Sequence, residues 1–316
     1  MSVSAEALAP ATGTGEKPSL RPVHLYGILH RVLMSWAGAA GMVIVILYLA
    51  VALLAPVIAP ANPQESNLLG LLAPPSSEAL LGRDEIGRDI LSRIIWGART
   101  SILIATLSVG ISLLVGSILG VLAGFLGRWV DALIVKVTDL LLAFPDILLA
   151  ITLVAALGTG LRSLIWAVGI ASVPRFVRVS RAAVLGVMPK PYIEAGISLG
   201  SSDFALIRRH VLPNALAPIV IEATLRLGVA ILTAASLSFL GLGVPPSVPE
   251  WGSMMSSARS YVRSAPHIIV FPGLALLILV LGFNLLGDAL RDSLDPSYKR
   301  ISNHQRRKPM GGKHAR

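Results

Sequence analysis

Ionisable side chains inside otherwise apolar stretches are the residues of this chain most able to do chemistry. Asp146 follows Pro145 in the middle of one apolar stretch, and Glu222 and Arg226 stand four residues apart in another. Such a spacing places two side chains on one helix face, where opposite charges can pair. Charges are costly in hydrocarbon and often mark the path of a polar solute. We expect Glu222 and Arg226 to form a structural pair, whereas Asp146 could either line a pathway or serve packing.

Patterns typical of an active site are missing from the sequence. The six His are scattered without metal-ligand spacing, and the absence of Cys excludes thiolate nucleophiles and cysteine-ligated metals. The run GLGVPP at 241–246 is Gly-rich, but it lacks the strand and helix that flank a phosphate-binding loop, so we interpret it as a turn. No Walker A motif is present. We therefore expect no catalytic residue, no bound metal and no cofactor in this chain.

The composition indicates a membrane protein. Hydrophobic residues make up 54% of the 316 residues, charged residues only 14%, and the mean hydropathy is +0.75, whereas a soluble domain averages about 25% charged residues. Blocks of about 20 apolar residues can cross a bilayer, and the backbone in lipid must close its hydrogen bonds within a helix. The prediction is an all-α integral membrane fold with about six spans, near residues 37–59, 101–126, 131–157, 163–184, 217–240 and 268–290.

Basic residues predict the orientation of these spans. Six spans place both termini on one side; with the N-terminus inside, 19 of the 27 Lys and Arg residues lie in inner segments and 7 in outer ones. The positive-inside rule therefore predicts that both termini face the cytoplasm. It also assigns the net charge of +10 to loops facing anionic lipid rather than to nucleic-acid binding.

The segments between the spans complete the predicted organisation. Residues 1–36 read as a poorly ordered cytoplasmic arm, and 297–316 as a basic cytoplasmic tail. Residues 60–98 and 241–267 are predicted to lie outside, the first ending in an interfacial helix with an apolar stripe. That stripe consists of Ile86, Ile90, Leu91, Ile94 and Ile95.

The cytoplasmic loop at 186–216 is patterned like structure rather than like a linker. Tyr192, Ala195, Leu199 and Phe204 are expected to form an apolar face, and Gly200 to allow a tight turn between two short helices. Pro213 is expected to end the second helix before the chain re-enters the bilayer. A short helical knob of this kind suits docking into a groove on a partner.

This loop resembles the EAA motif of ABC-importer permeases, which is Glu-Ala-Ala, three residues, Gly, nine residues, Ile, one residue and Leu-Pro. Glu194, Ala195, Gly200, Leu212 and Pro213 match it. Gly196 replaces the second Ala and His210 replaces the Ile, and the RHVLPN form is usual in the peptide and nickel branch. Three further blocks, at 81–103, 237–255 and 284–296, resemble the C-type permease of dipeptide and oligopeptide importers.

The resemblance implies the type I ABC importer fold, with a core permease domain at 99–296 in the cell membrane of a prokaryote. It implies a second, homologous permease as partner, one or two cytoplasmic ATPases that bind ATP and Mg²⁺, and an extracytoplasmic substrate-binding protein. It also implies that the seven EAA-loop residues couple the permease to the ATPase.

Two other classes of protein remain as alternatives. An ion-driven secondary transporter would show inverted repeats and broken helices around charges in the middle of the membrane. A membrane enzyme would need His, Asp or Glu clustered at one interface. Within the ABC class the substrate stays open among dipeptides, longer peptides, glutathione-like compounds and nickel complexes.

Overall fold

The computed structural model describes residues 25–294, and within that range it contains helices and one isolated β-bridge but no strand. Five helical segments are long and apolar enough to cross a membrane, and a bent pair of helices makes up to six. The predicted all-α fold of about six spans is confirmed. The long helices are α2 (Trp36–Ile58), α3 (Ile90–Leu126), α6 (Leu161–Val187), α9 (Leu212–Phe239) and α11 (His267–Leu294).

The shorter helices lie between these spans or before them. They are α1 (Leu25–Met34), η1 (Leu68–Gly70), α4 (Arg128–Leu142), α5 (Asp146–Leu157), α7 (Pro191–Ser198), α8 (Asp203–Leu206), the π-turn η2 (Ile207–Val211), α10 (Trp251–Ala258) and η3 (Arg259–Tyr261). Residues 1–36 were predicted to form a poorly ordered arm, and this was wrong for residues 25–34, which form helix α1. The rest of that arm, and the predicted tail, lie outside the described residues.

The third span was predicted as one continuous helix over 131–157, and this was wrong. The chain instead forms α4 and α5, which meet at an angle of 92°. Pro145 stands at the break. A proline disfavours the helical conformation of the residue before it and cannot donate to the preceding turn. The broken span therefore leaves Asp146 in the first turn of α5.

The predicted interfacial helix was also wrong in its extent. The helix begins at Ile90, capped by Asp89, whose Oδ2 accepts from the Ser92 amide at 2.7 Å, and it continues without a break into the second span. Ile86 lies before it, in a turn whose neighbours Arg83 and Asp89 form the isolated β-bridge. A strong N-cap explains why the helix begins at Ile90.

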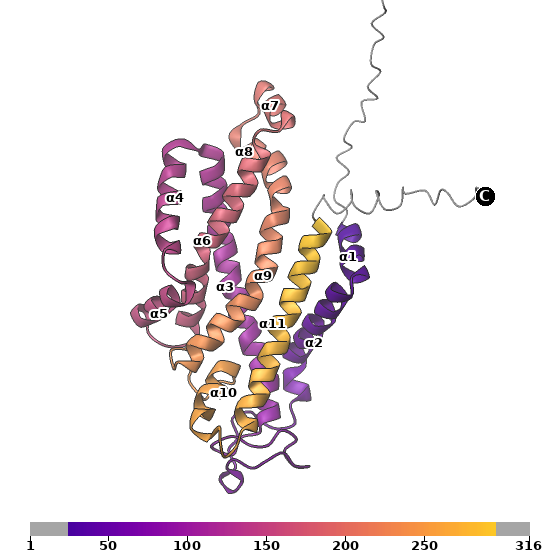
Figure 1. Ribbon diagram of the computed structural model, residues 1–316, viewed down its shortest axis with the longest axis vertical. Helices are drawn as coiled ribbons and strands as arrows, with labels where there is room; N and C mark the ends of the chain where they lie inside the picture. Colours follow the sequence, from indigo (N-terminus) through magenta and orange to yellow (C-terminus); the bar gives the residue numbers. More distant parts are fainter. Residues whose placement is uncertain (1–24, 295–316) are drawn as a thin grey trace, which may run out of the picture.

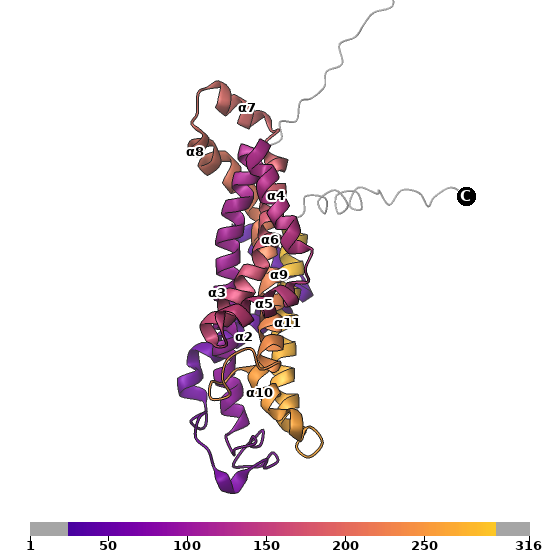
Figure 2. The same ribbon diagram turned by 90° about the vertical axis from the view of Figure 1, so that its left-hand side faces the viewer.

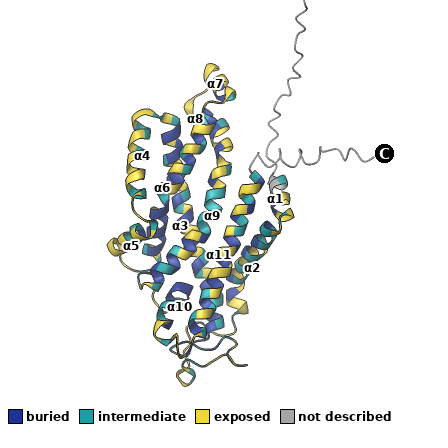
Figure 3. Ribbon diagram, in the orientation of Figure 1, coloured by how far each residue is buried: buried dark blue, intermediate teal, exposed yellow. Residues whose placement is uncertain are grey.

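Helices α3 and α6 form the centre of the core, and glycines let them approach closely. A Cβ added at Gly116, Gly120 or Gly124 would clash with α6. Three such residues at a spacing of four form the small-residue face that brings membrane helices together. Figure 3 shows buried residues concentrated on these two helices, while α2 and α4 carry many exposed ones.

The molecule is elongated along its spans, with different elements at its two ends. Figures 1 and 2 show α7 and α8 protruding at one end, which we call the α7 end; α1 and the end of α11 lie toward the same end. The connection 59–89 and α10 lie at the opposite end, which we call the α10 end. The chain thus separates the two kinds of loop that the sequence predicts for opposite sides of the membrane.

Candidate functional sites

The loop between α6 and α9 folds into a compact helical knob at the α7 end. Helix α7 ends at Ser198, and Gly200, which follows its C-cap Leu199, has a φ of +75°. The Gly200 amide donates to the Ile197 carbonyl at 2.9 Å, and the Ser201 amide donates to the Gly196 carbonyl at 3.0 Å. These two bonds are those of a Schellman motif, which requires a left-handed residue at this position. The predicted turn at Gly200 is therefore present.

The inner side of the knob is attached to the ends of the spans. Ile193 is fully buried in a small hydrophobic cluster, separate from the main core, with Val184 of α6 and Val211 of the π-turn. A Cβ at Gly196 would lie 2.7 Å from Leu206 Cδ2, so the glycine that departs from the motif lets α7 and α8 pack closely. Packing at this inner side holds the knob in a fixed position relative to the spans.

The outer side of the knob exposes large apolar side chains. Leu199 is 86% exposed, Phe204 is 73% exposed and Ile197 is 56% exposed. Of the predicted apolar face, Ala195, Leu199 and Phe204 are exposed on the knob, whereas Tyr192 is half-buried and packs against the Ile193 cluster. Exposed apolar side chains that gather on a protruding loop indicate a surface for another protein.

The motif residues occupy distinct places on the knob. Glu194 lies exposed in the first turn of α7, where a carboxylate is favourable to the helix dipole, and Ala195 beside it is also exposed. The N-terminus of α7 has no side-chain cap. The His210 ring lies 6.2 Å from the Tyr192 ring, between centroids.

Pro213 was expected to end the second helix, and this was wrong. The chain continues from α8 through the π-turn into α9, with Leu212 and Pro213 in the first turn of α9. Because proline lacks an N–H and crowds the carbonyl four residues before it, a wider turn is needed just there. The knob is therefore joined to α9 by helical backbone.

The intramembrane charges form one cluster rather than separate features. Arg226 Nε donates to Glu222 Oε1 at 2.7 Å, and Arg226 Nη1 donates to Asp146 Oδ2 at 3.2 Å. The side chain of Arg226 is 12% exposed, that of Glu222 is 21% exposed and that of Asp146 is 31% exposed. The expected pair is present, and Asp146 joins it from the start of α5.

A buried ionic network at the α10 end was not predicted. Arg88 pairs with Asp84 at 2.6 Å and with Glu85 at 3.1 Å. Arg88 Nη1 and Arg93 Nη2 both donate to the Pro246 carbonyl, at 3.0 and 2.9 Å. Two guanidinium groups thus fix the loop that follows α9. The charged residues of this network are close together in the sequence, but the Pro246 carbonyl that Arg88 and Arg93 share lies about 150 positions further along the chain.

Glu250 is a second polar residue that sequence reasoning missed. Its carboxylate caps α10 by accepting from the Gly252 amide at 2.9 Å and the Ser253 amide at 2.8 Å, and the residue is 1% exposed. Burial raises the pKa of Glu250, and the two backbone amides together with the nearby Ser238 hydroxyl offset part of that rise. A buried, capping carboxylate of this kind has a structural role.

These features define a multi-span helical membrane protein with a docking knob at one end and a charge cluster among its spans. The sequence matches, over residues 116–300, the family described as the binding-protein-dependent transport system inner membrane component. The chain belongs to this family, which consists of membrane permease components.

Its relatives include named transport permeases. The dipeptide transport system permease DppC of Alkalihalophilus pseudofirmus is 44% identical over 259 residues, covering 82% of this chain and 85% of that protein. The di/tripeptide permease DppC of Pseudomonas aeruginosa is 46% identical, covering 82% and 88%. The glutathione permease GsiD of Escherichia coli is 45% identical, covering 81% and 84%.

Solved structures share the fold at low identity. A chain of the inward-facing MetNI methionine ABC transporter is 20% identical with a TM-score of 0.54, covering 64% of this chain and 96% of that one. An amino acid ABC transporter is 16% identical with a TM-score of 0.51, covering 64% and 94%. The fold is that of type I ABC importer permeases, as the sequence predicts.

Proposed function

We propose that this chain is one permease subunit of an ATP-driven importer of di- or oligopeptides. The observation that carries the proposal is the knob, which exposes Leu199 and Phe204 beyond the spans while Ile193 anchors it to them. Relatives named for dipeptide and di/tripeptide transport support peptides as the substrate class.

The proposal includes partners that the chain needs. A homologous second permease completes the pathway, an extracytoplasmic binding protein delivers the substrate, and one or two ATPase subunits bind the knob. ATP and Mg²⁺ are bound by those subunits, because this sequence has no Walker A motif. In this arrangement the chain has no catalytic residue of its own.

The knob gives this machine a physical route for coupling. An ATPase that moves when it binds ATP would displace α7 and α8, and the helical connection through η2 would carry the displacement into α9. The two permeases form a bistable element, inward-open or outward-open, and ATP and the loaded binding protein favour different states. The seven motif residues Glu194, Ala195, Gly196, Gly200, His210, Leu212 and Pro213 act in this coupling.

Two alternatives remain as competing functions. The same machine would serve for nickel complexes or another small solute, since its fold does not select the cargo. An ion-driven secondary transporter is favoured by one observation, the broken α4–α5 span beside the Asp146–Glu222–Arg226 cluster. The knob argues for the ATP-driven machine, because an ion-driven transporter needs no such docking element.

Reconstitution of the complex tests the proposal. Proteoliposomes carrying this chain, its homologous permease and the ATPases are given the neutral dipeptide dialanine with the binding protein. We expect uptake that requires ATP on the ATPase side and that persists when ionophores dissipate every ion gradient. Uptake driven by an ion gradient without ATP would refute the ABC proposal. Competition by nickel or glutathione, but not by peptides, would refute the substrate class.

A further inference from the structure

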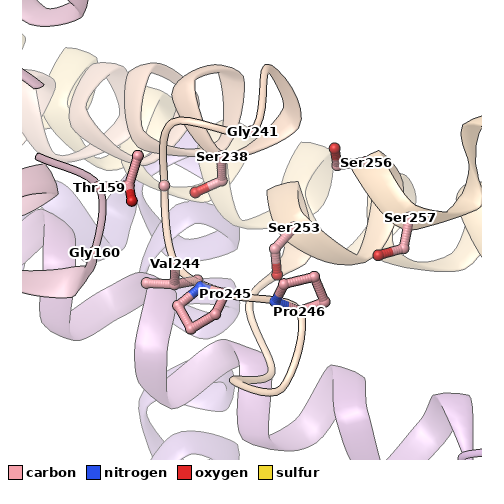
Figure 4. Close-up of a pocket in the computed structure, with 11 residues that line it drawn as sticks. Thr159, Gly160, Ser238, Gly241, Val244, Pro245, Pro246, Ser253, Ser256 and Ser257 are labelled. Carbon is pink, nitrogen blue, oxygen red and sulfur yellow. The ribbon is translucent and has the colours of Figure 1, made fainter. Parts of the chain in front are cut away.

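A cavity at the α10 end is lined by hydroxyl groups. It has a volume of about 390 Å³ and lies between the α5–α6 turn, the end of α9, the 241–246 loop and α10. Figure 4 shows Thr159 and Ser238 on either side of the 241–246 loop, and Ser253, Ser256 and Ser257 along α10. A volume near 390 Å³ falls in the range of about 300–1,000 Å³ typical of small-molecule sites.

The hydroxyls of this cavity differ in whether they already have partners. Ser253 Oγ donates to the Glu250 carbonyl at 2.9 Å, and Ser256 Oγ donates to the Phe239 carbonyl at 2.8 Å. Ser238 Oγ is buried close to the Glu250 carboxylate, and it makes no hydrogen bond of ordinary length among the described residues. Thr159 is exposed and Ser257 is half-buried, and neither side-chain hydroxyl makes a hydrogen bond within the described part of the chain. The last two are therefore available to a ligand as the cavity stands.

Ser238 lies deeper than the other hydroxyls of the cavity, close to the buried Glu250 carboxylate. Its oxygen lies beneath Gly243, where any side chain would collide with it. A shift of the 241–246 loop would uncover Ser238 to a molecule already held by Thr159 and Ser257.

The Pro246 part of the lining is held in place by two side chains. Its carbonyl accepts from both Arg88 and Arg93. The guanidinium groups themselves do not line the cavity, and neither does the buried Glu250. The lining therefore carries no formal charge.

An uncharged lining of hydroxyls selects a particular kind of ligand. Serine and threonine hydroxyls both donate and accept, so they match the N–H and C=O groups of a peptide main chain. Without a charged or large aromatic lining residue, the site would not discriminate among the side chains of a peptide. We propose that this cavity binds the main chain of the transported peptide as it enters the permease, with Thr159 and Ser257 as its first contacts. This inference rests on the proposed function.

A loop of the binding protein offers the same main-chain chemistry, but the cavity suits it less. Protein interfaces depend on buried aromatic and Arg anchors within a contact of about 800 Å² on each partner. Here Val244, Pro245 and Pro246 are the apolar lining residues, and Trp, Tyr, Phe and Arg are absent from the lining. We therefore assign the cavity to the cargo.

The first test separates the cargo from the binding protein. In the reconstituted complex, Thr159→Val with Ser257→Ala should lower the dialanine moved per ATP hydrolysed by at least about fivefold, because two hydrogen bonds to the peptide main chain are lost. Stimulation of the ATPase by loaded binding protein should not change. The matched control is Thr152→Val, which removes a hydroxyl that donates within α5 to the Leu148 carbonyl and lies outside the cavity.

Each other result overturns the assignment. A parallel loss of ATPase stimulation would assign the cavity to the binding protein, and unchanged transport per ATP would leave it without a role in transport. If wild-type complexes take up no dialanine, the proposed function fails first and this inference fails with it. Wild-type uptake with an unaffected double variant would overturn the inference alone.

A labelling experiment keeps the test valid even if the double variant fails to reach the membrane. The chain has no Cys, so Thr159→Cys introduces a unique thiol. Binding protein loaded with dialanine should slow its modification by a small methanethiosulfonate at least fivefold, whereas empty binding protein should not. Equal protection by empty binding protein, or protection by neither, would contradict the proposal.

Discussion

At the scale of single residues, Arg226 balances charges from two helices that are far apart in sequence. It contacts Glu222 in its own helix and Asp146 at the start of α5, so one guanidinium faces two carboxylates. Asp146 stands in the first turn of α5, where the helix dipole adds a favourable contribution of about 0.3–1 kcal/mol. The cluster fixes the break between α4 and α5 against the middle of α9. We interpret it as structural, with a pathway role for Asp146 as the competing hypothesis.

Removing the cation separates these two hypotheses. We expect Arg226→Met to reduce the membrane abundance of the chain, because two partly buried carboxylates lose their partner. The free energy of folding lost through Arg226→Met should stay below the roughly 3–5 kcal/mol lost when a fully buried pair is broken, since the two carboxylates retain some access to water.

The matched control for this change is the triple variant Asp146→Asn, Glu222→Gln and Arg226→Met. It carries no unpaired charge, so a structural cluster predicts recovered abundance together with recovered uptake. Immunoblotting of membranes and peptide uptake in the same cells measure both quantities. Normal abundance without uptake in the triple variant would instead favour a pathway role.

At the scale of elements, apolar blocks predicted the spans because burial in lipid depends mainly on composition. The break at Pro145 was not predictable in the same way, since prolines at 56, 174, 218 and 272 lie inside continuous helices. What distinguishes Pro145 is its tertiary setting, where Asp146 reaches Arg226. The Gly116–Gly120–Gly124 spacing was a signal present in the sequence and not used.

Part of the knob could be predicted from local rules and part could not. Gly200 was placed correctly, because a turn between two short helices needs a left-handed residue. The burial of Ile193 was not predicted, because it depends on Val184 near the end of α6 and Val211 of η2 rather than on the period of α7. The Arg88–Arg93–Pro246 network is likewise a product of tertiary contacts.

Gly200→Asp tests the knob as a docking element. The change should abolish transport and loosen ATPase attachment while the chain inserts at normal levels. A Cβ at Gly200 meets nothing within 4 Å in this chain, so the only internal effect is backbone strain at φ +75°, about 1–2 kcal/mol. The larger effect arises from placing a charge in the contact with the ATPase, where an unpaired charge is costly to desolvate.

Gly241→Asp is the control for this prediction. Gly241 has φ +83° and ends α9 in the same motif, with its amide donating to the Ser238 carbonyl and the Leu242 amide donating to the Leu237 carbonyl. It carries a similar strain at the opposite end, so it should leave the co-purified ATPase unchanged. It controls for ATPase attachment alone, because Gly241 also lines the cavity assigned to the cargo. ATPase recovered with the affinity-purified chain is the measurement. Equal attachment in wild type and Gly200→Asp would refute the docking role.

At the scale of the whole molecule, the two ends must face different compartments for the proposed machine to work. The knob at the α7 end has to meet cytoplasmic ATPases, and the cavity at the α10 end has to meet the binding protein outside. The geometry supplies two opposed ends, and the distribution of Lys and Arg assigns the α7 end to the cytoplasm. This orientation is a prediction that one pair of cysteines can test.

We expect a cysteine at Ser202 to be inaccessible to an impermeant thiol reagent added to intact cells, and a cysteine at Ser247 to be labelled. Both residues are exposed, Ser202 at the start of α8 and Ser247 in the loop before α10, so accessibility is limited by the membrane rather than by burial. The Cys-free parent gives no background. After permeabilisation both variants should react, which shows that the Ser202→Cys thiol is available. Labelling of Ser202→Cys in intact cells would reverse the orientation, and with it the assignment of the knob to an ATPase and of the cavity to incoming cargo.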